Sequence, residues 1–178
     1  MGAQYGSLTV LGAVALCAAL GVVTGRKMAI PEKLTWCGGD TIMEASVEQH
    51  EGADGQHLFS GYVYTPVDVD EKFLLVLEMY LPMPDGGTED KPTVLKLPDP
   101  CRTLKSSMPD MLDAIASMVN REAECPTPKG NYSFTDQTMK IPVDSMLLPL
   151  GDYKVHVESF LEDNKASCAD MAFKLVNE

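Results

Sequence analysis

Apolar and polar side chains alternate with a period of two residues through most of the chain after residue 37, and this alternation constrains the fold more than any other feature. Five segments show it, and each predicts a β-strand: 59–67, 73–81, 132–141, 153–161 and 169–176. In the fourth segment the alternation places Tyr153, Val155 and Val157 on one face and polar residues on the other. Strands of antiparallel sheets commonly have one buried face and one wet face in this way. We therefore expect a mainly β fold.

One segment has a helical period instead. Apolar residues recur at spacings of three and four, with Pro109 and Asp110 in the first turn: Met108, Met111, Leu112, Ile115, Met118 and Val119. The pattern predicts one short amphipathic helix over 108–119, in the loop between Cys101 and Cys125. Its apolar face either packs on a sheet as ordinary core, which periodicity alone favours, or covers a cavity.

The first 25 residues contain no charged side chain, and residues 8–23 are almost wholly Leu, Val, Ala and Gly. Such a run is typical of a signal peptide. It is shorter than the roughly 20 residues that span a bilayer, and it gives way to Arg26 and Lys27. We expect cleavage near Gly25, which would leave a single domain over 26–178 that is secreted or delivered to the lysosomal lumen. An uncleaved anchor is the alternative.

The net charge of -12 falls on the part of the chain after the signal peptide. A surface of this sign repels phosphate backbones, so a nucleic acid is not an expected partner.

Four cysteines follow the signal peptide: Cys37, Cys101, Cys125 and Cys168. An even number in an exported chain predicts two disulfides, for which three pairings exist. Zinc ligation is the rival interpretation, but no two cysteines have CxxC spacing and no histidine lies beside one. We therefore expect no metal site.

The sequence lacks the motifs of common catalytic and nucleotide sites, including a Gly-rich phosphate loop, HExxH and GxSxG. The three histidines, His50, His57 and His156, lie in polar stretches or on the wet face of a strand. We therefore expect a binding protein that is not an enzyme and holds no cofactor. Asn131-Tyr132-Ser133 is a glycosylation acceptor, which we expect to be exposed.

The C-terminal half carries Cys125-Pro126, Gly130-Asn131-Tyr132-Ser133, Gly151-Asp152-Tyr153-Lys154 and a last cysteine before the final strand. Upstream, Leu34-Thr35-Trp36-Cys37 and Leu97-Pro98-Asp99-Pro100-Cys101 lead into the first two cysteines. In this pattern the chain resembles the ganglioside activator protein family, which belongs to the lipid-recognition proteins of ML type. The resemblance spans the chain after residue 25 and is specific from Cys125 onward.

The resemblance implies an immunoglobulin-like β-cup of two antiparallel sheets around an apolar cavity. It also implies nested disulfides, Cys37 with Cys168 and Cys101 with Cys125. The implied activity is non-enzymatic binding and transfer of lipids, with a hydrolase or a receptor as partner. The family has further cysteine pairs near the helical loop, which this chain lacks, so that loop should be less constrained.

The family also has an apolar rim tip with a tryptophan that inserts toward the membrane. The matching position here is Leu147, between Met146 and Leu148, and we expect these three residues to contact a membrane transiently. The alternative is that they are buried at the end of a strand.

The inward positions of the strands and of the helix should line the cavity. We predict as ligand-binding Leu75, Leu77, Met79, Met111, Leu112, Ile115, Met118, Val119, Leu147, Val155, Val157, Met171 and Phe173. The chain's 11 methionines suit an adaptable apolar wall. Two alternatives stay open: a carrier of small hydrophobic signal molecules, and a solid-core secreted domain that acts through its surface, which a filled interior would favour.

Overall fold

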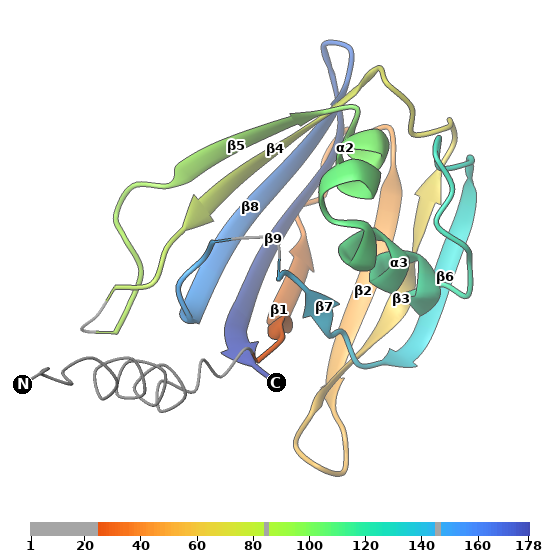
Figure 1. Cartoon of the computed structure of the whole chain (residues 1–178). Helices are drawn as coiled ribbons and strands as arrows, with labels where there is room; N and C mark the ends of the chain where they lie inside the picture. The colour runs from red at the N-terminus through yellow and green to blue at the C-terminus, as the bar shows by residue number, and fades with distance from the viewer. Residues whose placement is uncertain (1–24, 84–85, 145–146) are drawn as a thin grey trace, which may run out of the picture.

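The computed structural model describes residues 25–83, 86–144 and 147–178 (Figure 1). The core of the predicted signal peptide and Met146 therefore lie outside the described residues. The elements, in chain order, are β1 (Lys27–Trp36), β2 (Glu44–Glu51), β3 (His57–Thr65), β4 (Phe73–Tyr80), β5 (Thr93–Pro98), α2 (Pro100–Ser107), α3 (Pro109–Met118), β6 (Gly130–Gln137), β7 (Ile141–Pro142), β8 (Gly151–Leu161) and β9 (Asn164–Asn177). Within the described ranges, no helix is long and apolar enough to cross a membrane.

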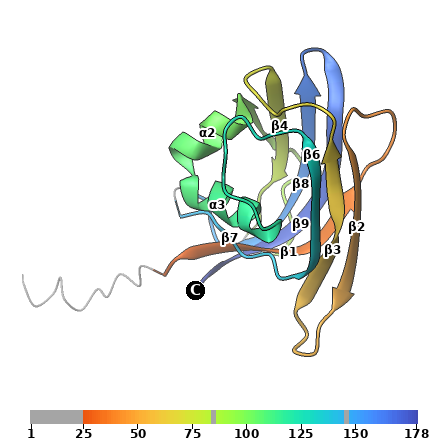
Figure 2. The same ribbon diagram turned by 90° about the vertical axis from the view of Figure 1, so that its right-hand side faces the viewer.

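The strands form two antiparallel sheets. The larger sheet has the order β5-β4-β8-β9-β1-β7, and the smaller one has the order β2-β3-β6. The chain passes from the large sheet to the small one between β1 and β2, and it returns between β3 and β4. Both helices come between β5 and β6, with α2 against β4 and β5 and α3 against β7 (Figure 2). The expected mainly β cup of two antiparallel sheets is confirmed.

Strand register places the predicted apolar positions on one face of the large sheet. Met79, Val155 and Met171 lie opposite one another across β4, β8 and β9. Tyr153 lies opposite Phe173, and the two rings stack with their centroids 5.0 Å apart. Because directly paired residues point to the same side of a sheet, these rows form one continuous apolar face.

Two disulfides join the chain, Cys37 to Cys168 and Cys101 to Cys125. This is the nested pairing that the family resemblance implied, so the expectation is confirmed. The first bond ties the end of β1 to β9, and the second closes the loop that holds both helices.

The helical loop differs from the prediction. A helix over 108–119 is confirmed as α3, but a second helix, α2, precedes it. The Asp99 side chain caps α2 by accepting a hydrogen bond from the Arg102 backbone N–H at 3.2 Å, and Pro100 suits the first helical turn. The helices are separate because Pro109 disfavours helical backbone at Met108, whose φ is -143°.

The predicted strand 132–141 is also divided. It becomes β6 in the small sheet and β7 in the large sheet, with Asp136 in left-handed backbone near the end of β6. Asp136 lies at a register irregularity of β6 against β3, and the chain crosses to the other sheet over 138–140. Period-two alternation alone does not reveal such a crossing.

Candidate ligand-binding site

Two apolar clusters lie between the sheets. The first gathers buried residues of the large sheet and its approaches: Ala29, Met79, Val143, Tyr153, Val155, Phe173 and Leu175. The second gathers Phe59, Phe134 and Met139 around the small sheet. The interior therefore has two separate apolar walls rather than one continuous buried core.

Helix α3 joins these walls. Met111, in its first turn, packs against the first cluster, whereas Met118 and Val119 at its other end pack against the second. Ile115 lies between them on the same face of the helix, four residues after Met111 and three before Met118. Its residue surface is nevertheless 39% exposed. Neither apolar cluster therefore covers the middle of the helix.

The same incomplete filling recurs on the strands. Leu75 and Leu77 on β4 face the same side as buried Met79, yet both are only half-buried. Three of their four register partners on β5 and β8 are also half-buried: Leu95, Leu97 and Val157. In a fully packed sandwich these central positions would interdigitate with the opposite sheet at near-crystal density. These inward apolar side chains are therefore incompletely packed.

A cleft of about 730 Å³ opens at one end of the sheets. It is lined by Gly25, Arg26, Lys27, Asp144, Leu148, Pro149, Leu150 and Asn177. Leu148 also packs against the first apolar cluster, so the cleft adjoins the interior. Its volume falls within the range of about 300–1,000 Å³ that is usual for small-molecule sites.

Polar contacts hold together the elements around this cleft. Arg26 pairs with Asp110 of α3 at 2.5 Å and with Asp144 at 3.0 Å. The Lys27 ammonium donates to the Leu148 carbonyl at 3.0 Å. The Tyr153 hydroxyl donates to the Pro149 carbonyl at 2.6 Å, and burial raises the pKa of this phenol. The start of β1, the start of α3 and the loop before β8 are thus held together.

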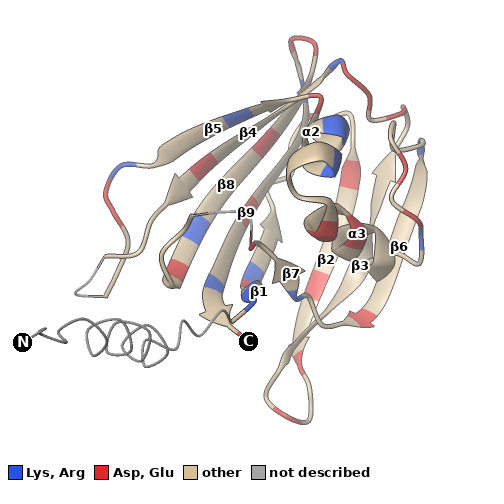
Figure 3. Ribbon diagram, viewed as in Figure 1, with Lys and Arg blue, Asp and Glu red and all other residues tan. Residues whose placement is uncertain are grey.

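Apolar side chains project from the same end. Leu147 is 99% exposed, Leu150 is 48% exposed and Met83 is 38% exposed. The β4–β5 loop lies beside the start of β8, because a Cβ added at Gly151 would be 2.8 Å from the Cβ of Pro82. Figure 3 shows both basic and acidic segments at the adjoining strand ends. The basic residues there are Arg26, Lys27, Lys154 and Lys174, of which Arg26 pairs with Asp144 and Lys174 with Asp152. We call the exposed side chains of Met83, Leu147 and Leu150 the rim.

The structure brings most of the predicted ligand-binding residues together. Met79, Val155 and Phe173 are buried in the first cluster, and partly buried residues packed against the two clusters include Leu77, Met111, Met118, Val119, Val157 and Met171. Leu147 does not contact either cluster, since it is almost wholly exposed. Leu148, expected at the membrane, packs inward instead. Sequence reasoning missed Leu95 and Leu97, whose alternation in a six-residue strand is too short to stand out.

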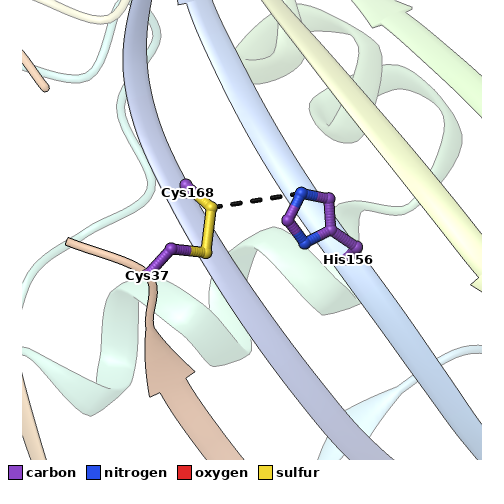
Figure 4. Close-up of side chains that lie close together, drawn as sticks. All are labelled: Cys37, His156 and Cys168. Carbon is purple, nitrogen blue, oxygen red and sulfur yellow. Dashed lines mark hydrogen bonds between the residues drawn. A yellow bond between two sulfur atoms is a disulfide. The ribbon is translucent and has the colours of Figure 1, made fainter. Parts of the chain in front are cut away.

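The outer face of the large sheet carries a polar cluster around His156 (Figure 4). The hydrogen bond to Asp170, 2.7 Å from Nδ1, raises the pKa of His156 above its ordinary value. A hydrogen bond from Lys165 lowers the pKa of Glu158. Nε2 of His156 lies 4.0 Å from Sγ of Cys168, which is bonded to Cys37. In the oxidised chain these sulfurs are neither nucleophiles nor thiolate ligands.

No model of a known protein family matches the chain, and no curated protein matches it. Among solved structures, the chain is similar to chicken MD-1 in its crystal structure with lipid IVa. The two share 13% identity and a TM-score of 0.32, over 86% of this chain and 99% of chicken MD-1. The strand order, register and disulfides of this chain itself establish its fold.

Proposed function

We propose that this chain is a non-enzymatic binding protein that holds a lipid between its two sheets and transfers it. The observation that carries the proposal is the half-exposure of inward apolar side chains on both sheets and on α3. Moving ligand surface onto these side chains releases about 2.5 kcal/mol per 100 Å² of apolar area, at about 25 cal/mol per Å². An acyl chain or a sterol-like ring offers surface of this kind.

Ligand access is proposed at the rim end. The cleft of about 730 Å³ adjoins the first cluster there, and the rim side chains can enter the apolar boundary of a membrane. Of the nearby cations, Arg26 and Lys174 are paired with carboxylates, so an attraction for anionic headgroups would come from Lys27 and Lys154, although the whole chain carries a net charge of -12. Met146, predicted as part of this contact, lies outside the described residues.

The setting proposed for this activity is extracellular or lysosomal. It rests on the apolar N-terminal segment of the sequence and on the two disulfides, which persist in oxidising compartments. The exposed position of Asn131 on β6 supports its glycosylation. We further propose a hydrolase or a receptor as partner, on the family resemblance alone.

The first experiment is mass spectrometry of organic extracts from natively purified protein, with a denatured sample of the same preparation as control. Near-stoichiometric lipid released from the native sample would support the proposal and name the ligand class. A clean protein that also fails to take up a fluorescent fatty acid would refute it and favour the solid-core alternative. Uptake of small apolar signal molecules in place of lipid would favour the carrier alternative.

A pair of variants locates the ligand. Leu77→Asp places a charge on the inward face of β4 and should abolish uptake of the fluorescent fatty acid. Val94→Asp is the matched control, since Val94 is 50% exposed on the outward face of the neighbouring strand β5. Circular dichroism checks that both variants fold. Unchanged uptake by folded Leu77→Asp protein would contradict an interior site.

A further inference from the structure

A second cluster with ligand chemistry lies on the outer face of the large sheet, away from the apolar interior. It consists of Cys37, His156, Glu158, Cys168 and Asp170. Cys37, His156 and Cys168 each offer one ligand atom, and these three atoms lie within 4.8 Å of one another (Figure 4). Glu158 lies opposite Cys168 in the β8–β9 register, and its Oε1 is 3.6 Å from Nε2 of His156. Two sulfurs and an imidazole thus lie together, with the Glu158 carboxylate beside the imidazole.

The imidazole is oriented as in protein zinc sites. Asp170 lies 2.7 Å from Nδ1, so in a neutral imidazole that donates from Nδ1 the lone pair of Nε2 is available to a metal. Nε2 in turn faces Sγ of Cys168 at 4.0 Å. A carboxylate that holds the far nitrogen of a ligating histidine is the usual outer-shell arrangement around a metal.

We propose that reduction of the Cys37–Cys168 disulfide converts this cluster into a zinc site with Cys37, Cys168, His156 and Glu158 as ligands. A dithiol supplies the two electrons: it becomes a disulfide while both cysteines become thiols. Zinc binding then releases the two thiol protons to solvent, and both sulfurs bind as thiolates. The site is independent of the proposed lipid-binding function.

The geometry needs one local adjustment. Zinc bonds of about 2.0–2.3 Å in a tetrahedron place neighbouring ligand atoms about 3.3–3.8 Å apart. Glu158 and His156 already have this spacing, whereas the sulfurs must separate after reduction. Cys37 is exposed and precedes Gly38 and Gly39. A Cβ added at either glycine would meet no atom within 4 Å, so the segment after Cys37 has room to move.

The backbone around the site should persist in the reduced chain. The Cys37 N–H donates to the Cys168 carbonyl at 3.1 Å, next to the paired strands β1 and β9. These hydrogen bonds keep both cysteines beside His156 after the covalent bond is lost. Lys165 opposes the site, because its ammonium holds Glu158 Oε1 at 2.5 Å and must leave for zinc to bind.

The test compares zinc affinity of the oxidised and reduced full chain by competition with a chromogenic chelator. Reduction is limited to the point where alkylation and mass spectrometry show Cys37 and Cys168 free. Each disulfide has one buried cysteine, but Cys37 is exposed whereas Cys125 is half-buried, which favours this order of reduction. We expect one zinc per reduced chain, at least 100-fold weaker binding to the oxidised chain, and a thiolate-to-cobalt absorption band when Co²⁺ replaces zinc. Equal affinity of the two forms would overturn the proposal.

Variants separate ligation from chance binding. His156→Ala should weaken zinc binding by more than about 100-fold, and Asp170→Asn by about 10- to 100-fold. Lys165→Gln should strengthen binding, while the control His50→Ala, in the small sheet, should not change it. If reduction unfolds the chain, Cys37→Ser frees the Cys168 thiol without a reductant and should give a weaker cobalt band. Absence of that band in the folded variant refutes the site.

Discussion

Replacement of Ile115 by alanine tests the unfilled interior quantitatively. The substitution removes three carbon atoms, which is worth about 2.4 kcal/mol for a fully buried side chain at about 0.8 kcal/mol per methylene. Ile115 is 39% exposed, so about 0.9 kcal/mol of that value is still available to a ligand and about 1.5 kcal/mol already stabilises the fold. We therefore expect Ile115→Ala to raise the Kd for an interior ligand about fivefold.

The assay has two parts. Titration of lipid-stripped protein with a fluorescent fatty acid gives the change in Kd, and urea unfolding of the same samples gives the change in stability. Val94→Ala is the control, because Val94 is 50% exposed on the outward face and should leave the Kd unchanged. A loss of about 3 kcal/mol or more in stability with no change in Kd would mean that Ile115 is ordinary core, and the reasoning from its exposure would be refuted.

Three further predictions follow from the structure. Replacing Cys101 and Cys125 by serine opens a loop whose ends are 24 residues apart and should lower the free energy of unfolding by about 3 kcal/mol, as measured in urea; a change below 1 kcal/mol would contradict this. Leu147→Asp at the rim should reduce sedimentation with anionic vesicles yet leave fatty-acid uptake from solution intact, and unaltered sedimentation would exclude the proposed membrane contact. Asp170→Asn should lower the pKa of His156 in NMR titrations, because the Asp170 hydrogen bond raises it. The stabilisation from that bond is present below the ordinary pKa of histidine and is lost as pH rises through the pKa of His156 in the folded chain. The difference in free energy of unfolding between the native chain and Asp170→Asn should therefore become smaller as pH rises.

The strands that the sequence predicts are those with one buried and one wet face. β8 and the second half of β9 alternate, and their inward residues Tyr153 and Leu175 are each 1% exposed. β1 is different because Pro31 interrupts its pattern. Proline cannot donate to a ladder, and the register of β1 against β9 shifts between Pro31 and Lys33. A strand with such an irregularity gives no regular period to read.

Edge strands gave equally little signal. β2 pairs only with β3 and is largely exposed, with Ala45 and Val47 as its half-buried apolar positions. β5 has six residues and ends at Pro98, where the turn into α2 begins. Their places in the sheets depend on pairing partners far away in the chain, which local alternation does not encode.

For the candidate site, the apolar positions could be predicted but not their exposure. Period two and the helical spacing identify residues such as Leu77 and Ile115 as inward-facing. Whether the interior around them is filled depends on how far apart the two sheets stand. That distance is set by the crossings between the sheets and by α3, which contacts both apolar clusters.

Helix α3 contains no fully buried residue, although it touches both walls of the interior. Its surroundings therefore resemble a surface contact more than a structural core. Each sheet keeps its own hydrogen-bonded ladder without the helix, and the Cys101–Cys125 bond closes the segment at its base. Displacing α3 would therefore break the Arg26–Asp110 ion pair and a few shallow apolar contacts, while the hydrogen-bonded ladders of the two sheets stay intact.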